Sequence, residues 1–328
     1  MTTQLSFRAD GTFRIVQITD LHWQNNDPED RQSRLLMDRI IEEEQPDLVV
    51  FTGDMIHCEL ARDRRAAFRQ AVAAAADQRL PWAFVFGNHD AEEGITREEM
   101  TALARELPGC VVPPEQEPCG IGNYTLPIAR RNSHDRSRSS SSAAAVLYLL
   151  DSGSYAPASV GAAAWIKREQ IDWYIGQSRR YEAANGGKPL PALAFFHIPL
   201  PEFQEMWDFR TCYGYNFEGV GCSRINSGMF AAMIERGDIA GVFVGHDHVN
   251  DYWGTHHGIR LCYGRATGFN AYGHADMPRG ARVIELFEDG RPFRTWLRLE
   301  DGLRMDAQPV HHSVFEEVSV QIRKRLAR

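Results

Sequence analysis

The sequence predicts an α/β fold, and three observations carry that prediction. Strand-like and helix-like segments alternate through the first third of the chain, a polar cluster follows each early strand, and the last third is rich in strand patterns. Such alternation is typical of a sheet covered by helices, with the loops after its strands gathered on one face. Periodicity alone does not distinguish one doubly wound sheet from two packed sheets.

The chain begins with a βαβαβ pattern. Residues 13–19 alternate apolar and polar side chains, and the apolar runs 48–51 and 82–86 predict two further strands. Helical spacing of leucine and isoleucine predicts a helix over 30–44, which the following proline ends, and an alanine- and arginine-rich stretch predicts another over 61–79. The polar residues after the three strands are Asp20 and His22, then Asp54, then Asn88 and His89.

The middle and end of the chain continue with strands and helices. The expected helices are 96–107, 163–182 and 226–236, and the expected strands are 124–129, 145–150, 192–196, 239–244, 259–263, 281–287 and 293–299. The strand over 192–196 closes on His197. The strand over 239–244 leads into GHDH, which places His246 and His248 at a strand end.

Length and composition favour a single domain. The chain has 328 residues, is 43% hydrophobic and 24% charged, and shows no obvious linker. We assign residues 1–310 to this domain and expect a helical tail over 311–328. The Arg/Ser-rich stretch 130–142 cannot bury a core, so we expect a flexible surface loop there. Anion binding by its arginines is the less favoured alternative.

Charge and hydropathy exclude several classes of protein. A net charge of −8 argues against a sequence-independent nucleic-acid binder, which needs a basic face. The N-terminus lacks a secretory-signal pattern, and no run approaches the ~18 apolar residues of a membrane span, so we expect a cytoplasmic protein that does not cross a membrane. The six scattered cysteines are expected to be mostly reduced; Cys110 with Cys119, or Cys212 with Cys222, are less favoured disulfide pairs.

The residues at the strand ends form a candidate metal centre. Taken alone, the two histidines of GHDH would be interpreted as loop residues that bind nothing. Together the strand ends supply carboxylate, imidazole and amide donors, a mixed set suited to zinc, iron or manganese. These donors are too many for one ion, but two ions that share a bridging carboxylate accommodate them. Two metals roughly 3.5–4 Å apart are a known device for phosphate-ester hydrolysis. The polar residues collected at these strand ends are Asp20, His22, Asp54, Asn88, His89, His197, His246 and His248.

The ordered set of motifs resembles the calcineurin-like metallophosphoesterases. Its parts are DLH at Asp20, GD at Asp54, GNHD at Gly87, a histidine after a buried strand, and GHDH at Gly245. The segments WIKREQIDWY, HIPLPEF, GHDHVNDYWG and YGRATGFNAYG are most similar to the purple-acid-phosphatase-like subgroup. The resemblance spans 13–273. It implies a four-layer fold, in which a central two-sheet β-sandwich is flanked by helices.

The resemblance also implies a role for each candidate ligand. One ion would be bound by Asp20, His22, Asp54 and His248, and the other by Asp54, Asn88, His197 and His246, so that Asp54 bridges the two. His89 matches the histidine that binds the phosphoryl oxygens or protonates the leaving group, a role that contributes about 10²- to 10⁴-fold to the rate. A packed, non-catalytic His89 is the alternative.

The second motif departs from that of the purple acid phosphatases. Those proteins resemble GDxxY there, with a tyrosine that binds ferric iron and gives the colour, whereas this chain has His57. The first motif, which resembles D-x-G in those proteins, gains His22 here. The gain of His22 therefore compensates for the lost tyrosine, and the number of ligands stays the same. We expect His57 to lie beside the ligands. We also expect the iron-loaded protein to show no tyrosinate-to-iron charge-transfer band. A protein Ser/Thr phosphatase is less favoured, because GDMIHCE lacks the arginine of GDxxDRG.

The expected function is hydrolysis of a phosphate ester by a binuclear metal-dependent phosphoesterase. A metal-bridging hydroxide would attack phosphorus in line, and a small phosphorylated molecule would be the substrate. An acid-phosphatase-like phosphomonoesterase is favoured over a phosphodiesterase of the same fold, and nucleic acid would enter only as a phosphodiester substrate. The alternative of another class is a non-catalytic scaffold, against which the complete set of ligands argues.

Substrate contacts are expected just beyond the metal loops. Asn250, Arg265 and Tyr272 lie there in strongly patterned segments. Arg265 could bind a phosphate oxygen with its forked guanidinium group, or could equally form a structural ion pair.

Overall fold

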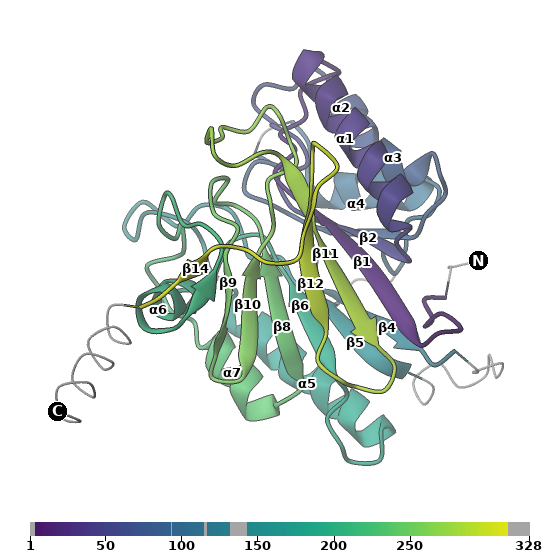
Figure 1. Ribbon diagram of the computed structural model, residues 1–328, viewed down its shortest axis with the longest axis vertical. Helices are drawn as coiled ribbons and strands as arrows, with labels where there is room; N and C mark the ends of the chain where they lie inside the picture. Colours follow the sequence, from purple (N-terminus) through teal and green to yellow (C-terminus); the bar gives the residue numbers. More distant parts are fainter. Residues whose placement is uncertain (1–3, 93, 115–116, 132–142, 314–328) are drawn as a thin grey trace.

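Two β-sheets packed face to face form the centre of the molecule (Figure 1). The structure, a computed structural model, describes residues 4–92, 94–114, 117–131 and 143–313. The loop expected over 130–142 and the tail expected over 311–328 therefore lie outside the described residues, except for 130–131 and 311–313.

The first sheet contains the early strands and the end of the chain. Its order is β13-β12-β11-β1-β2-β3. The strands β1, β2 and β3 are parallel, and β11 pairs with β1 in antiparallel fashion, so the C-terminal ends of three neighbouring strands share one edge. The bounds are β1 Thr12–Ile18, β2 Leu48–Thr52, β3 Trp82–Val85, β11 Gly280–Phe287, β12 Arg294–Leu299 and β13 Arg304–Met305.

The second sheet has the order β14-β7-β9-β10-β8-β6-β5-β4. The strands β5, β6, β8 and β10 are parallel, which again places the ends of neighbouring strands along one edge. The bounds are β4 Tyr124–Ala129, β5 Ala143–Leu149, β6 Ala192–Phe195, β7 Cys212–Tyr213, β8 Ile239–Val244, β9 Trp253–His256, β10 Ile259–Tyr263 and β14 Val310–His311.

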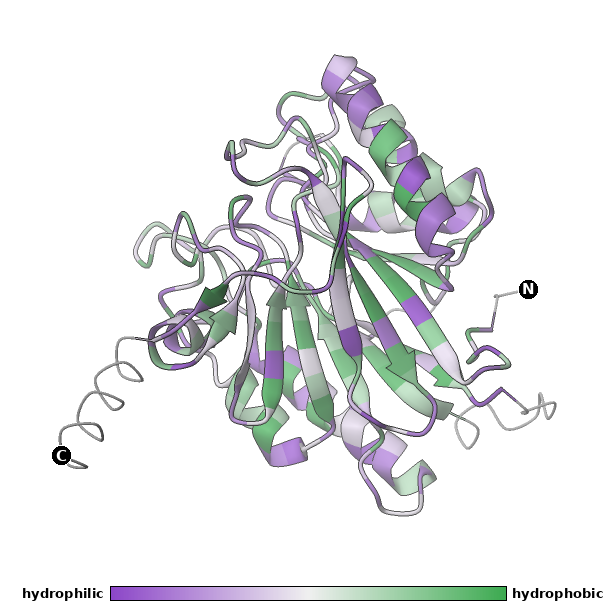
Figure 2. Cartoon of the chain, viewed as in Figure 1, coloured by the Kyte–Doolittle hydropathy of each residue, from purple (hydrophilic) through white to green (hydrophobic). Residues whose placement is uncertain are grey.

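Helices cover the outer face of each sheet. One buried cluster contains apolar residues of both sheets and of α1, α2 and α4, and a second joins the other face of the second sheet to α5, α6 and α7. The strands are predominantly hydrophobic, whereas the helices alternate hydrophobic and hydrophilic residues (Figure 2). This is the predicted four-layer fold. The helices are α1 Pro28–Glu44, α2 Arg64–Ala71, α3 Ala73–Ala76, α4 Arg97–Glu106, α5 Arg168–Ala184, α6 Glu202–Phe209 and α7 Met229–Arg236.

Several predicted elements differ from those observed. The helix expected over 61–79 is divided into α2 and α3. The helix expected over 163–182 begins only at Arg168, because Ala164 N donates to Ser154 O and Ala163 pairs with Tyr155. The sequence analysis did not predict α6 or β9, both of which are short.

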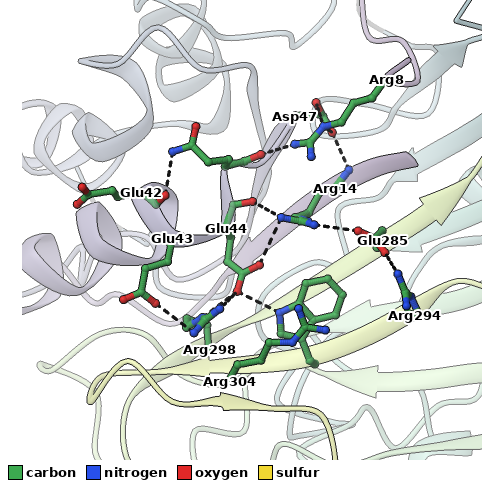
Figure 3. A network of polar contacts seen from close by, with 12 residues as sticks. Arg8, Arg14, Glu42, Glu43, Glu44, Asp47, Glu285, Arg294, Arg298 and Arg304 are labelled. Atoms are coloured by element: carbon green, nitrogen blue, oxygen red, sulfur yellow. Dashed lines mark hydrogen bonds and ion pairs between the residues drawn. The ribbon is translucent and has the colours of Figure 1, made fainter. Parts of the chain in front are cut away.

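Charged residues join the end of α1 to the first sheet (Figure 3). The buried carboxylate of Glu44 lies 2.6 Å from Arg298 and accepts from Trp296 Nε1 at 3.1 Å. Arg14 on β1 forms an ion pair with Glu285 on β11 at 3.0 Å. These contacts hold α1 against the sheet that supplies four of the seven candidate ligands.

The sequence also predicts that the chain does not cross a membrane and that its cysteines are mostly reduced. Among the described residues, no helix combines the length and the apolar character that a membrane span requires. The six cysteines, all of them described, form no disulfide.

Candidate metal centre

The seven candidate ligands come from five strand ends, and the fold brings them together between the two sheets. In the first sheet, Asp20 and His22 follow β1, Asp54 follows β2, and Asn88 follows β3. In the second sheet, His197 follows β6, and His246 and His248 follow β8. Asp20 Oδ1 accepts a hydrogen bond from the backbone N of His246 at 3.1 Å, which ties the two sheets together at this point.

The backbone at these strand ends is unusual. Asp20, His22, Asp54 and His246 have φ values of +57°, +50°, +50° and +78°. Left-handed backbone at residues other than glycine costs about 1–3 kcal/mol each and is concentrated at functional sites. Four such residues in one cluster indicate that the fold keeps these side chains in place at the expense of local stability.

The first group of donors consists of Asp20, His22, Asp54 and His248, whose ligand atoms all lie within 4.8 Å of one another. His22 Nε2 is 3.1 Å from His248 Nε2 and 3.5 Å from Asp54 Oδ2, and His248 Nε2 is 3.5 Å from Asp20 Oδ1. Side-chain donors converge on one point from three loops, which is the arrangement that an ion requires.

The second group shares Asp54 with the first and adds His197 and His246. His197 Nε2 is 3.2 Å from Asp54 Oδ2 and 3.3 Å from His246 Nδ1. His197 Nδ1 lies 2.8 Å from Thr52 O and donates to it, so the tautomer that leaves Nε2 free for a metal is favoured. Asp54 therefore belongs to both groups of donors.

Asn88 and two glycines, Gly53 and Gly87, make the second group suitable for an ion. The Oδ1 atom of Asn88 is buried and has no hydrogen-bond partner among the described residues, as expected of an oxygen reserved for a metal. A Cβ atom at Gly87 would lie 2.1 Å from Asp54 Oδ1, and one at Gly53 would lie 2.5 Å from His197 Nδ1. The turns after β2 and β3 thus need glycine for the ligands to approach one another.

The electrostatics keep most of the imidazoles neutral. Burial lowers the pKa of His22 to about 4 and that of His246 to about 3, and it holds the pKa of His248 well below its usual range. A neutral imidazole keeps a lone pair for a metal. The donor set therefore fits borderline divalent or trivalent cations such as zinc, iron or manganese.

The two buried carboxylates of the centre have opposite pKa shifts. Burial raises the pKa of Asp20 to about 7. For Asp54 the same burial effect is outweighed by the nearby histidines, first of all His197, so its pKa lies well below the usual range. Burial alone would lower the pKa of His197, but Asp54 raises it to about 10. A multivalent cation would stabilise two buried carboxylates that lie this close together.

His89 lies beside the donors without being part of either group. Its backbone N donates to Asp54 Oδ1 at 2.9 Å, and its ring centroid is 5.2 Å from that of His22. Its Nδ1 is 3.0 Å from Glu92 Oε1, and the same carboxylate oxygen accepts from Tyr155 OH at 2.9 Å. The ring, partly exposed and fixed on one side, is placed to meet a molecule bound at the centre.

The predicted substrate contacts have different environments. Arg265 is 2% exposed, forms an ion pair with Asp251 and donates to Pro278 O at 2.9 Å, so its contacts are those of the structural alternative. Asn250 is fully buried and accepts from Phe217 N at 3.0 Å, which anchors a loop. Tyr272, in contrast, is 56% exposed and its ring centroid is 4.1 Å from that of His248.

Sequence reasoning missed Glu92, Tyr155 and Glu218. Tyr155 is 58% exposed and receives a hydrogen bond from Asn88 Nδ2 at 3.3 Å, and Glu218 accepts from Tyr272 OH. Glu92 follows GNHD by two residues, a local signal that could have been used; Tyr155 and Glu218 carry no such signal. His57 lies beside the ligands, with its ring centroid 5.3 Å from that of His22.

Comparison with known proteins identifies the family. A model of the family described as calcineurin-like phosphoesterase matches residues 13–250, so the chain belongs to this metallophosphoesterase family. A protein of Arabidopsis thaliana named "Probable inactive purple acid phosphatase 29" is 35% identical over 333 residues, covering 91% of this chain and 85% of that protein. "Phosphatase DCR2" of Saccharomyces cerevisiae is 30% identical over 327 residues, covering 88% of this chain and 54% of that protein.

Solved structures share the fold at low sequence identity. A dimetal phosphatase from Danio rerio has a TM-score of 0.57 at 14% identity and covers 91% of this chain and 98% of that one. GAP50, described as the anchor in the inner membrane complex of Plasmodium, has a TM-score of 0.54 at 10% identity and covers 92% of this chain and 90% of that one. These two similarities establish the fold alone. The chemistry has to be inferred from the residues of the site.

Proposed function

We propose that this protein is an active binuclear metal-dependent phosphoesterase, acting as an acid-phosphatase-like phosphomonoesterase on a small phosphorylated substrate. One observation carries the proposal: two converging groups of donors share the single carboxylate of Asp54, and His89 lies next to it. The first ion would be bound by Asp20, His22, Asp54 and His248, and the second by Asp54, Asn88, His197 and His246. We further propose that residues 1–310 form this unit.

The ions, when bound, would supply Lewis-acid activation of the phosphoryl group and of a water molecule. The residues of the chain do the rest. Asn88 is held by Tyr155 through its Nδ2, so its Oδ1 stays directed away from that contact. The Nδ1 atom of His89 faces Glu92, so Nε2 is the nitrogen that can reach a phosphoryl or leaving-group oxygen. Tyr272 stands at the exposed side of His248 and forms one wall for the bound ester.

A specific observation favours a second candidate function, a non-catalytic scaffold. The Arabidopsis relative has "inactive" in its name, and GAP50, which shares the fold, is described as an anchor. The donor sets of this chain argue for activity, because converging metal donors with His89 beside them fit phosphate-ester hydrolysis, whereas a binding surface does not require them. The two candidates differ in one measurable property, turnover of a phosphate ester by the metal-loaded protein.

The decisive experiment compares metal content and turnover in ligand variants. The protein is purified with manganese, zinc or iron, and hydrolysis of an aryl phosphate is measured for the wild type, Asn88→Ala and His246→Ala. We expect about two ions per chain in the wild type and a loss of activity of at least about 10²-fold in each variant. Asn185→Ala, at a partly exposed residue, and His312→Ala, at an exposed residue, are matched controls that should keep full activity.

Two results would contradict the proposal. One is less than one ion per chain after purification with excess metal. The other is full activity in both Asn88→Ala and His246→Ala. A protein that binds two ions, hydrolyses no ester with any of the metals and captures a partner tightly would instead establish the scaffold.

A further inference from the structure

A second set of metal donors lies on the outer part of the second sheet. Glu205 belongs to α6, His256 ends β9, and His257 begins the turn to β10. A carboxylate oxygen of Glu205 and one nitrogen from each imidazole lie within 4.8 Å of one another. None of these residues belongs to the candidate metal centre described above.

His256 is a buried imidazole whose nitrogens lack good partners. The residue is 2% exposed, and its Nδ1 is buried without a hydrogen-bond partner among the described residues. Its Nε2 is 3.6 Å from Glu205 Oε1, a distance longer than a hydrogen bond. Burial also lowers the pKa of His256, which favours the neutral ring that a metal needs. A buried ring nitrogen without a hydrogen-bond partner requires an explanation, and a bound ion would supply one.

The backbone of His257 is held in an uncommon conformation. His256 pairs with Ile259, so His257 and Gly258 form a two-residue hairpin turn, with φ values of +47° and +87°. Such turns favour asparagine, aspartate and glycine at the position that His257 occupies. The turn directs a second imidazole next to the first, with ring centroids 4.2 Å apart. Turn chemistry alone does not explain the choice of histidine.

We propose that Glu205, His256 and His257 bind one Zn²⁺ ion. Two imidazole nitrogens and one carboxylate oxygen are a donor set that zinc accepts, and water would complete the tetrahedron because Glu205 and His257 are exposed. The three ligand atoms, which lie within 4.8 Å of one another, have to approach one another to bind a common ion. The flexible, 53% exposed side chain of Glu205 can do so at little cost.

The position of this site gives the ion a structural role. The loop after His197 leads directly into α6, and the loop after His248 leads directly into β9. Tyr252 OH donates to Phe203 O at 3.0 Å, so α6 and the segment before β9 already touch. A zinc ion between Glu205 and the hairpin would fasten α6 to β9, and with them the two loops that carry histidines of the binuclear centre.

The test counts zinc ions in variants that leave the binuclear donors intact. Chelator-treated protein is reloaded with zinc and desalted, and zinc per chain is measured together with the melting temperature. We expect Glu205→Gln and His257→Asn to contain one zinc ion fewer than the wild type and to lose a zinc-dependent rise in melting temperature of a few degrees. Asparagine keeps the left-handed turn at 257, and Asp208→Asn on the same helix is the control.

The proposal does not depend on phosphoesterase activity. The measurement is the difference of one zinc ion per chain between the wild type and the variants, whatever the total zinc content is. An anomalous zinc peak between α6 and the hairpin in crystals of the wild type, absent in Glu205→Gln, would support it. Equal zinc content in wild type, Glu205→Gln, His257→Asn and Asp208→Asn would overturn it. If His257→Asn fails to fold, the comparison of Glu205→Gln with Asp208→Asn still decides.

Discussion

At the residue scale, Glu92 fixes the position of His89. Its Oε1 lies 3.0 Å from His89 Nδ1 and accepts from Tyr155 OH, and its side chain is only 10% exposed. The carboxylate therefore orients the imidazole through Nδ1 and leaves Nε2 on the other side of the ring. Tyr155 in turn connects this pair to Asn88.

This network leads to a prediction about Glu92 and Tyr155. If the proposed function holds, we expect Glu92→Gln to lower kcat about 10-fold or more, because the ring of His89 loses the carboxylate that orients it. Tyr155→Phe should lower kcat less, since Glu92 remains. Steady-state kinetics on an aryl phosphate measure both effects. Glu98→Gln, at an exposed position of α4, is the control, and an unchanged kcat in Glu92→Gln would contradict the assignment.

Arg265 and Tyr272 lead to opposite predictions. Arg265→Gln leaves Asp251 buried without its charged partner, so we expect a loss of about 3 kcal/mol in the free energy of unfolding. Tyr272→Ala removes an exposed ring next to His248, so we expect a several-fold higher KM and nearly unchanged stability. Urea unfolding and kinetics on both variants separate the two roles. If Arg265→Gln raised KM and left the free energy of unfolding unchanged, Arg265 would instead be a substrate contact.

At the element scale, the polar network of Figure 3 holds α1 on the first sheet, and Glu285 lies within it. The side chain is 4% exposed and forms ion pairs with Arg14 and Arg294. Burial would raise the pKa of Glu285, but its hydrogen bonds to these arginines outweigh that effect and hold the pKa below its ordinary value of 4.5.

A pH dependence follows from this lowered pKa. A carboxylate whose pKa is lower in the folded state stabilises the fold above its unfolded pKa and loses that contribution as the pH falls through the folded pKa. We expect Glu285→Gln to cost on the order of 2 kcal/mol at pH 7, and this difference from the wild type to shrink below pH 4.5. Urea titrations at several pH values measure it. A difference that stays constant down to pH 3 would exclude the ion pairs as the cause.

At the scale of the whole molecule, the candidate metal centre joins the two sheets. Asp20, Asp54 and Asn88 come from the first sheet, and His197, His246 and His248 come from the second. Without ions, the centre consists of buried carboxylates and imidazoles whose interactions are only partly favourable. Ions bound there would therefore stabilise the packing of one sheet on the other.

We accordingly predict that metal removal destabilises the whole fold. A ligand at a hundred-fold excess over its Kd adds about 2.7 kcal/mol, so chelation should lower the melting temperature by several degrees. Calorimetry with and without a chelator measures the change. Asn88→Ala, which lacks one donor, should show a smaller chelator effect than the wild type. Identical melting curves for the chelated and the metal-loaded wild type would show that no ion joins the sheets.

The sequence by itself determined the chemistry of the strand ends. Glycine, aspartate and histidine directly after apolar runs are local patterns, so Asp20, Asp54, His89 and the two histidines of GHDH could be recognised in the chain. The same local patterns located most helices and strands. The short elements α6 and β9 were missed because packing against neighbours, rather than their own periodicity, stabilises them.

Only the tertiary structure decided which residues meet. The contacts of Arg265 with Asp251, of Tyr155 with Glu92, and of Glu205 with His256 depend on how loops and layers pack, and no spacing in the chain encodes them. The division of the carboxylate and imidazole donors into two groups that share Asp54 has the same origin, since the two sheets supply different members. Local sequence sets which donors a strand end presents, and long-range packing sets which of them lie close together.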